Sequence, residues 1–553
     1  MLTRLAGGRV IDPAHGIDGQ VRDLYLRDGR IIDAPSDAGG AHSIDVSGRI
    51  VMAGAIDLHT HVGGGKVNLA RLLMPEDHRG HGYERTALTR SSCGHVAPGT
   101  LAAGYRYAEM GYTACFEPAM LPINARQTHL ELADTPIVDK GCYAMLGNDD
   151  FFLRLLATGE SQQRINDYVG WIMDCTHAIA IKVVNPGGIS AFKFNQRKLD
   201  VDQAHPYYRV TPRRILQALA RAVHDLGVPH GLHVHGCNLG VPGNVDTTLA
   251  TIEAAEGLPI HLTHIQFHSY GSEGDHKFSS ASGRIAEAIN ANPNVSADVG
   301  QIMFGQTVTA SGDNMAQFRN ADLGSPRKSV VMDIECDAGC GVVPFRYRDQ
   351  SFVNALQWAI GLEIFLSVHD PWRIFLTTDH PNGAPFTSYP HLIRLLTDHA
   401  FRDQMLQKIH PDARAASTLG SLTREYSLYE IAIMTRAGPA RTLGLSDRGH
   451  LGAGAAADVV VYRDDADRER MFATPEYVFK DGELIVRDGR LVKVTCGSVH
   501  AVKPDYDRSI EAPVAEYFER FQTSSAAGFR ISSDELRECG SELIVHECRG
   551  ASR

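Results

Sequence analysis

Residues 53–62 have the sequence Ala53-Gly-Ala-Ile-Asp-Leu-His-Thr-His-Val62, a mostly apolar run that predicts a buried β-strand. Side chains two residues apart on a strand point to the same side, so Asp57, His59 and His61 are expected to share one face. Three glycines follow at residues 63–65, where the backbone can approach a ligand closely because no Cβ intervenes. Two imidazoles side by side form half of a metal site. The simpler alternative is a pair of polar residues at a strand end.

Seven further apolar segments follow between residues 51 and 450, and helical segments separate them. With the first, the predicted strands are residues 53–62, 112–117, 142–147, 178–184, 231–236, 260–266, 295–303 and 374–378. Residues 212–226 illustrate the helices, since apolar residues recur there at helical spacing. This alternation predicts an α/β fold, a (β/α)8 TIM-type barrel whose site lies at the carboxyl ends of the strands. A doubly wound open sheet is the alternative, but no Gly-x-Gly-x-x-Gly motif opens a helix after a strand.

Both ends of the chain differ from this middle part. Short alternating segments joined by Asp-Gly turns occur near residue 28 and again near residues 481 and 488, a pattern typical of β-hairpins. Residues 1–50 and 451–500 are therefore predicted to form one small β-sandwich-like domain built from both termini. Residues 51–450 form the predicted barrel domain. Residues 501–553 are predicted to be a partly helical C-terminal extension, for which the sequence suggests no role.

Composition argues against several classes of protein. The formal net charge is −11, whereas a general nucleic-acid binder needs a basic face. The N-terminal residues lack the apolar segment of a secretory signal, and no run of about 18 apolar residues predicts a membrane span. The ten cysteines lack the spacing of zinc or iron–sulfur motifs, so reduced thiols are expected. A cytoplasmic protein without nucleic-acid or membrane partners is predicted.

Histidines recur at the predicted strand ends. The segment 231–236 contains His233 and His235 on one face, and the segment 260–268 places His264 and His268 on one face with His261 on the other. The eighth strand is followed by Asp379. A single histidine at a strand end is more often a hydrogen-bonded core residue. Histidines at three strand ends and an aspartate at a fourth favour a metal site at the mouth of the barrel.

Lys182 lies within an apolar segment that is typical of a strand buried on both faces. A buried ammonium group is costly and tends to lose its proton. The alternative is a lysine that extends to solvent from the strand end. The functional hypothesis is that neutral Lys182 takes up CO₂ as a carbamate, N6-carboxylysine, whose two oxygens bridge two zinc ions.

Together these residues resemble the amidohydrolase superfamily, in the subtype with a carboxylated lysine. The segment 451–462 is also similar to that superfamily's return into its β domain. Four segments, residues 181–188, 235–244, 264–268 and 378–386, resemble more specifically the family of A subunits of formylmethanofuran dehydrogenase and of the bacterial formyltransferase/hydrolase complex. This resemblance implies hydrolysis of an N-formyl group on a methanofuran-type carrier, which releases formate and free amine, or the reverse condensation. It also implies partner subunits and a place in one-carbon metabolism, as in methylotrophic bacteria.

The resemblance also implies a ligand set. The expected metal ligands are His59, His61, Lys182, His235, His264 and Asp379, around two zinc ions. His235 is preferred over His233 because the family-like His-x-x-Asn pattern begins there, and His268 remains available to contact the substrate. Asp57 is expected to orient a ligand histidine.

Asp379 is the expected catalytic residue, first as general base toward water and then as acid toward the leaving amine. A group of arginines in the insertion after the first strand could receive an acidic tail of the carrier: Arg71, Arg79, Arg85 and Arg90. Two alternatives remain, a cyclic-amide hydrolase of the dihydropyrimidinase or dihydroorotase kind and a non-catalytic scaffold paralogue. The sequence leaves open the direction of reaction, the exact carrier, one metal or two, and whether partner subunits carry tungsten or molybdenum.

Overall fold

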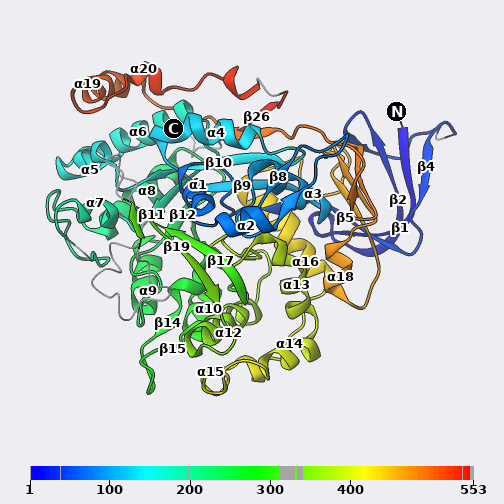
Figure 1. The fold of residues 1–553 in the computed structure, drawn as a ribbon. Coiled ribbons are helices and arrows are strands. Elements are labelled where there is room, and N and C mark those ends of the chain that lie inside the picture. The colour runs from blue at the N-terminus through cyan, green and yellow to red at the C-terminus, as the bar shows by residue number, and fades with distance from the viewer. Residues whose placement is uncertain are drawn as a thin grey trace.

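The computed structural model describes residues 2–37, 39–196, 198–311, 330–332, 340–537 and 540–548. Eight parallel strands form a curled sheet at the centre of the larger part of the molecule (Figure 1). In chain order they are β6 (Ala55–Asp57), β9 (Tyr112–Met120), β10 (Asp139–Leu146), β11 (Ala180–Val184), β12 (Leu232–His235), β13 (Ile260–Leu262), β16 (Val295–Asp298) and β20 (Ile374–Phe375). Each predicted segment overlaps one of these strands, and neighbours pair in parallel in chain order. The predicted (β/α)8 barrel is confirmed.

The barrel closes between its first and last strands, just beyond their carboxyl ends. Thr60 and His380 form an isolated parallel bridge, and the His61 backbone N–H donates to the His380 carbonyl at 2.9 Å. Several strands are shorter than predicted, because the backbone turns where polar side chains begin. His264, for example, has a φ of +36°, outside the extended region, so β13 ends before it.

Helices follow most barrel strands and cover the outside of the sheet. The principal ones are α3 (Thr100–Glu109), α4 (Ala125–Ala133), α6 (Gln162–Thr176), α8 (Pro212–Asp225), α9 (Val245–Ala254), α10 (Ser282–Ala291), α12 (Phe352–Ser367), α13 (Tyr389–Thr397) and α17 (Gly438–Leu443). The predicted helix at 212–226 is confirmed as α8, whose first turn is capped by the Thr211 hydroxyl. None of the described helices is both long and apolar enough to cross a membrane.

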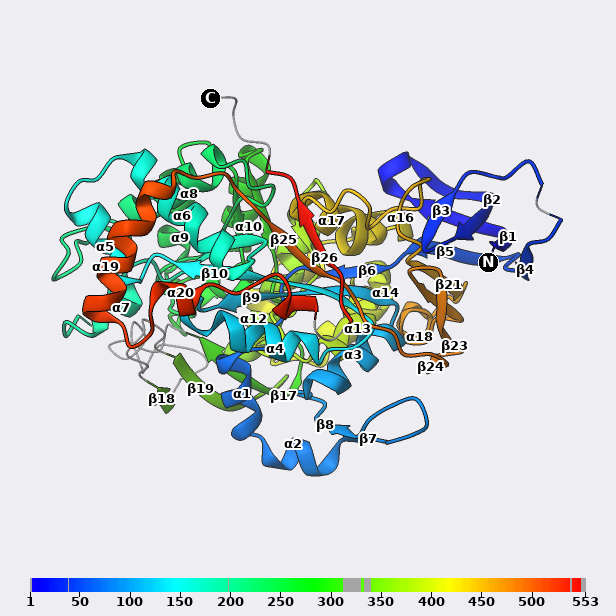
Figure 2. The ribbon, with the colours of Figure 1, turned by 90° about the horizontal axis from the view of Figure 1, so that it is seen from above.

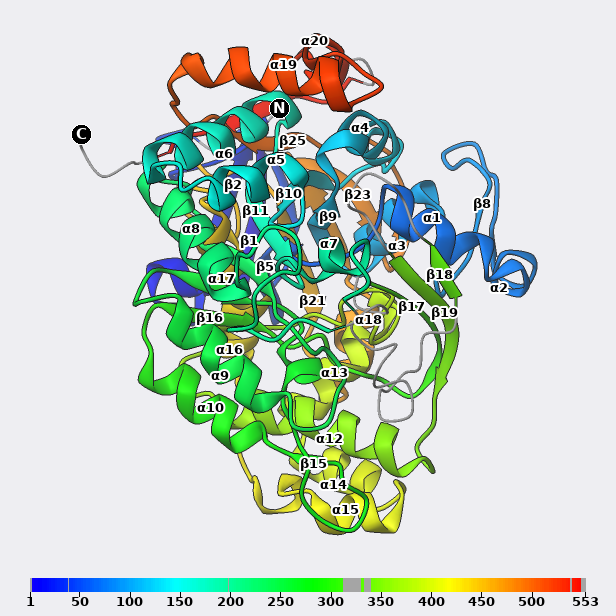
Figure 3. The same ribbon diagram turned by 90° about the vertical axis from the view of Figure 1, so that its left-hand side faces the viewer.

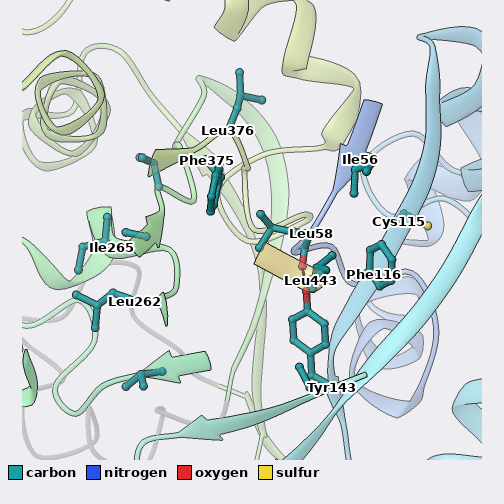
Figure 4. Packing of buried hydrophobic residues seen from close by; sticks show 14 of the residues in the cluster. Ile56, Leu58, Cys115, Phe116, Tyr143, Leu262, Ile265, Phe375, Leu376 and Leu443 are labelled. Carbon is teal, nitrogen blue, oxygen red and sulfur yellow. Dashed lines mark hydrogen bonds between the residues drawn. The ribbon is translucent and has the colours of Figure 1, made fainter. Parts of the chain in front are cut away.

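Apolar side chains fill the space between the sheet and its helices. Figure 4 shows Ile56, Phe116 and Phe375 from separate strands within this core. Tyr143 points toward Leu58, and its hydroxyl donates to the Leu58 carbonyl. The core therefore fixes the backbone immediately before His59.

A second sheet lies beside the barrel and combines strands from two distant parts of the chain (Figure 2). Its strands are β1 (Leu2–Asp12), β2 (Ile17–Arg27), β3 (Arg30–Ile32), β4 (His42–Asp45), β5 (Arg49–Ala53), β21 (Val459–Arg463), β22 (Tyr477–Lys480), β23 (Glu483–Arg487) and β24 (Arg490–Leu491). The antiparallel pair β5–β21 joins the two parts. Because β5 leads within two residues into β6, this sheet anchors the first barrel strand.

The C-terminal extension returns to the barrel. Strand β25 (Val499–Val502) pairs with β10 at Lys140 and with β26 (Leu543–His546), so it crosses the predicted boundary at residue 500. Between these strands, α19 (Glu511–Phe521) packs on α6, where the Trp171 ring contacts those of Phe518 and Phe529. The boundaries of the domains remain a prediction.

Short elements surround the carboxyl ends of the barrel strands. They are α1 (Gly65–Leu72), α2 (Pro75–Gly80), α5 (Asp150–Ala157), α7 (Gly188–Phe192), β17 (Gly305–Ser311), β18 (Val330–Met332) and β19 (Cys340–Tyr347). Figure 3 shows α1 beside β17 and β19, which it contacts. These elements form the rim around the mouth of the barrel.

A buried ion cluster joins the three parts of the molecule at the opposite end of β10. Asp139 Oδ2 accepts from Arg448 Nε at 2.8 Å, and Asp139 Oδ1 lies 3.1 Å from Lys480 Nζ. Lys480 also lies 3.3 Å from Asp458 Oδ1, and the Ser498 backbone N–H donates to Asp139 at 2.7 Å. Burial alone would raise the pKa of Asp139, but the two cations hold it well below its usual range. The cluster thus links the barrel to the second sheet and the C-terminal extension.

Replacing Asp139 tests this link. Asp139→Asn leaves two buried cations with one buried carboxylate fewer, so the free energy of unfolding is expected to fall by about 3–5 kcal/mol. Denaturant unfolding followed by circular dichroism measures the change. Glu535→Gln is the control, because it removes an exposed ion pair with Arg126 and should change stability little. Equal effects of the two substitutions would contradict the role of the cluster.

Candidate metal centre

The six candidate ligands all lie at or just beyond the carboxyl ends of barrel strands, and all are buried. They are His59 and His61 after β6, Lys182 on β11, His235 at the end of β12, His264 after β13 and Asp379 after β20. Short distances connect five of them directly. The sixth, Lys182, is close enough to Asp379 for that carboxylate to raise its pKa.

Asp379 is the meeting point of the first group. Its Oδ1 lies 2.9 Å from His59 Nε2 and 3.3 Å from His61 Nε2. His59, His264 and Asp379 offer ligand atoms that all lie within 4.8 Å of one another. Within the described chain, His264 Nδ1 is buried without a hydrogen bond. Such atoms are expensive to leave unpaired, so the arrangement fits a bound cation.

A second group shares His264 with the first. His235, His264 and His268 also offer ligand atoms within 4.8 Å of one another, and His264 Nε2 lies 2.9 Å from His235 Nδ1. Burial lowers the pKa of His264 well below its usual range, which favours the neutral ring that binds metals. Each of the two groups has the ligand types and the spacing of a metal site, and the groups share His264. His268 therefore lies with the candidate ligands.

Lys182 lies one strand away from His235, and its backbone pairs with that of His233. Burial lowers its pKa to about 8, the Asp379 carboxylate opposes this shift and the Lys66 ammonium adds to it. A lysine with this pKa is neutral far more often at physiological pH than a surface lysine. Neutral amine is the form that reacts with CO₂, so the environment of Lys182 favours the carbamate hypothesis.

Asp298, at the end of β16, is a residue of this site that the sequence pattern did not single out. Its Oδ1 accepts from the His264 backbone N–H at 3.0 Å, and its Oδ2 lies 3.1 Å from His261 Nε2 and 3.3 Å from His59 Nδ1. Burial alone would raise the pKa of Asp298, but the two histidines hold it well below its usual range. Asp298 orients the backbone of one candidate ligand and the ring of another. An acidic residue inside an apolar predicted strand was the available signal.

Glu117, on β9, performs the same task for His61. Its Oε1 lies 2.8 Å from His61 Nδ1, and its Oε2 accepts the Val62 backbone N–H at 2.8 Å. The contact leaves His61 Nε2 directed at Asp379. Together with Asp379, Glu117 outweighs the effect of burial and raises the pKa of His61. Glu117 was the last residue of a predicted strand, and its role was missed.

The predicted orientation of His261 is wrong. His261 points into the barrel toward Asp298, because β13 ends at Leu262 and the turn at His264 breaks the alternation. His233, the alternative ligand, lies deeper than His235. Its Nε2 contacts His59 Nδ1 at 2.9 Å, and its Nδ1 contacts His230 Nε2 at 2.9 Å. In this position His233 supports the His59 ring.

Two further expectations differ from the structure. Asp57 does not contact a ligand imidazole among the described residues, since it accepts the His59 backbone N–H at 3.1 Å and the Tyr107 hydroxyl at 2.7 Å. Burial raises the pKa of Asp57 to about 6. Arg71 is partly buried, and its guanidinium donates to the Val62 carbonyl at 2.6 Å and the Pro98 carbonyl at 2.9 Å. These bonds fix the loop after β6, so Arg71 is not available to a carrier tail.

Comparison with known proteins identifies the family of this barrel. The model of the amidohydrolase family matches residues 43–486, which includes every candidate ligand. The chain belongs to the amidohydrolase family. Within this amidohydrolase, the matched residues also include Asp298 and Glu117.

Two curated relatives match the amidohydrolase over nearly its whole length. The A subunit of the formyltransferase/hydrolase complex Fhc of Methylorubrum extorquens is 44% identical over 524 residues, 94% of each chain. Protein FwdA of Methanocaldococcus jannaschii is 39% identical over 96% of each chain. In the crystal structure of the FhcABCD complex from Methylorubrum extorquens with methylofuran, one chain is similar with a TM-score of 0.93. That chain is 42% identical, over 99% of this chain and 100% of its own length.

Glu117→Gln tests whether the carboxylate behind His61 supports metal binding. Loss of its charge weakens the orientation and basicity of the His61 ring, so metal affinity is expected to fall about 10–100-fold. Competition with a chelator measures the affinity. Glu109→Gln is the control, because Glu109, the last residue of α3, is also a hydrogen-bonded carboxylate and accepts from the Tyr83 hydroxyl at 2.8 Å. Unchanged affinity in Glu117→Gln would contradict the assignment.

Proposed function

We propose that this amidohydrolase hydrolyses the N-formyl amide of a methanofuran-type carrier to formate and free amine, or catalyses the reverse condensation, as the catalytic component of a multi-protein complex of one-carbon metabolism. In that complex it would take the place of the A subunits that it resembles. One observation carries the proposal. The His59–His264–Asp379 group lies in a chain that is 42% identical, over almost its entire length, to a chain of a complex with methylofuran. Membership of the amidohydrolase family supports amide hydrolysis as the reaction. The similarity to the A subunit and to the complex with methylofuran supports a formyl carrier as the substrate. The cytoplasm is the proposed location.

The proposed cofactors are two zinc ions. The residues that would hold them are His59, His61, His235, His264 and Asp379, together with the carbamate of Lys182. Imidazole nitrogens and carboxylate oxygens are ligands that zinc accepts. Bound zinc supplies Lewis acidity, which makes water a stronger acid and withdraws charge from a carbonyl oxygen.

Asp379 is the proposed acid–base residue. Its carboxylate is buried, and the neighbouring histidines hold its pKa well below its usual range, so it is ionised in the resting protein. Asp379 follows the last barrel strand, which adjoins the first strand where the barrel closes. From there its carboxylate contacts His59. Asp379 takes the proton from water as the formyl carbon is attacked and returns it to the leaving amine nitrogen.

The other buried carboxylates keep the ligands in place during this cycle. Asp298 fixes His59 and the backbone of His264, and Glu117 fixes His61. Fixed rings cost no reorganisation as charge develops in the transition state. The proton transfer is therefore left to Asp379.

Asp379→Asn tests the acid–base assignment. The amide keeps the size of the side chain but accepts no proton, so formate release from the formylated carrier is expected to fall about 10²–10⁴-fold. Circular dichroism verifies the fold, and Asp412→Asn, at an exposed position, is the control. Near-normal turnover in Asp379→Asn would refute the role. Ring opening of a cyclic amide by the wild type, without formate release, would favour the dihydropyrimidinase-like alternative.

Mass spectrometry of the native protein tests the carbamate. The intact, metal-loaded protein should carry the mass of one CO₂ in addition to the mass of its sequence, and acid should remove it. Lys182→Ala should lose bound metal and activity, and a small carboxylate added to the buffer should restore part of both. Lys503→Ala, an exposed lysine near Asp174, is the control. Unmodified Lys182 in metal-loaded wild type would contradict the hypothesis. Absence of metal from the wild type would favour a scaffold.

A further inference from the structure

A groove lies between the insertion after the first barrel strand and the second sheet. The insertion contains a short hairpin of β7 (Gly82–Tyr83) and β8 (Ser92–Cys93), and the loop between them, residues 84–91, lies beside β24 (Figure 2). The groove has a volume of about 500 Å³, and residues from both sides line it, among them Tyr83, Glu84, Leu88, Arg490 and Leu491. Neither the candidate metal centre nor the ion cluster at Asp139 involves this part of the molecule.

The second sheet ends at this groove. Strand β24 pairs with β23 on one side, and no described strand pairs with it on the other. An unpaired edge is a template for strand addition, in which an extended segment of another chain continues the sheet through main-chain hydrogen bonds. Leu491 of β24 and Leu88 of the insertion loop offer apolar contacts, and Leu88 is 46% exposed. The groove therefore suits an extended segment that carries apolar side chains.

Four arginines without an internal counter-charge surround the groove. Arg490 on β24 lies directly opposite Arg487 on β23, so two like charges face each other across the hairpin, an arrangement that destabilises a sheet. Arg85 and Arg90 are exposed in the insertion loop. Within the described chain, none of the four forms an ion pair at 4.0 Å or less. Acidic side chains of another molecule would relieve the repulsion between them.

The acidic groups near the groove do little to balance these charges. Asp488, in the turn between Arg487 and Arg490, forms an ion pair with Arg463. Glu109 accepts from the Tyr83 hydroxyl at 2.8 Å. Among the described residues that line the groove, Glu84 is the remaining carboxylate. One such group leaves the four arginines largely uncompensated, so the groove attracts acidic side chains.

We propose that the groove binds an extended acidic segment of a partner protein, which continues the second sheet at β24. The existence of a partner rests on the proposed function, in which this amidohydrolase belongs to a multi-protein complex. The main chain of the segment meets the free edge of β24, and its apolar side chains contact Leu88 and Leu491. Its carboxylates pair with the four arginines, where bidentate hydrogen bonds add geometric specificity. The insertion loop and the second sheet thus form one docking surface.

Photo-crosslinking in the natively purified complex identifies the occupant. Leu88 is replaced by p-benzoylphenylalanine, and Val21, which is 68% exposed on β2 of the same sheet, receives the same replacement as the control. Mass spectrometry then sequences the crosslinked peptides. Leu88 should capture a partner protein through a segment of net negative charge, and Val21 should not capture this segment. Capture of a second copy of this chain, of the carrier, of a segment without negative charge, or of nothing overturns the proposal.

Charge reversal measures the contribution of the arginines. Arg487→Glu combined with Arg490→Glu should reduce retention of the captured partner on the tagged chain at least about tenfold, because like charges then face each other across the interface. Arg487→Lys combined with Arg490→Lys should retain most of the partner. Arg22→Glu combined with Arg27→Glu is the matched control, since both arginines are exposed on β2 of the same sheet. Full retention after reversal at β23 and β24, or an equal loss in the control, overturns the proposal.

Two further readouts separate docking from stability and from the proposed activity. Metal content and thermal unfolding of the charge-reversed protein should equal those of the wild type, because the two glutamates repel each other as the two arginines do. A loss of either would assign the arginines a structural role and contradict the docking surface. Failure of the wild type to release formate from the carrier would refute the proposed activity, whereas the crosslinks would still decide what the groove binds.

Discussion

The contact between the first and last strands of the barrel is the constraint on which the candidate centre depends. The His61 backbone N–H donates to the His380 carbonyl, and this single bond places the two histidines of the first strand opposite Asp379. These segments are more than 300 residues apart in the sequence, and each supplies only part of the set of ligand atoms. The closure converts two strand ends into one set of ligand atoms. Any change that opens this joint would separate Asp379 from both rings.

Carboxylates lie on both sides of the ligand histidines around this joint. Asp379 faces the open side of the ligand rings, whereas Asp298 and Glu117 lie behind them and contact their other nitrogens. His233 and His261 extend the arrangement downward into the barrel, where burial keeps their pKa values low. The negative groups therefore touch the rings at both nitrogens, which fixes each ring in one orientation. Lys182 and Lys66 lie on the neighbouring side, where burial and the charge of Lys66 both lower the pKa of Lys182.

Much of this arrangement could be predicted from the sequence. All eight strands were placed, since each is an apolar segment bounded by turns, and the histidines at their ends indicated one edge. The strand ends were less predictable. His264 adopts a positive φ that a two-residue alternation does not reveal, so the side of His261 was assigned incorrectly. Asp298 and Glu117 were missed because a single acid within an apolar run has no spacing to mark it, and only the fold brings it behind a histidine.

The ion cluster at Asp139 also bears on how the chain reaches its native state. It joins residues from the third barrel strand to Arg448, Lys480 and the strand at the C-terminal end. During synthesis, the barrel strands emerge before these partners. Asp139 therefore remains a solvated carboxylate until Arg448, Lys480 and Ser498 have been synthesised. Contacts between such distant segments slow folding, because a long loop closes before they stabilise anything. The segments around Arg448, Lys480 and Ser498 thus secure the barrel and the second sheet only after these residues have been synthesised.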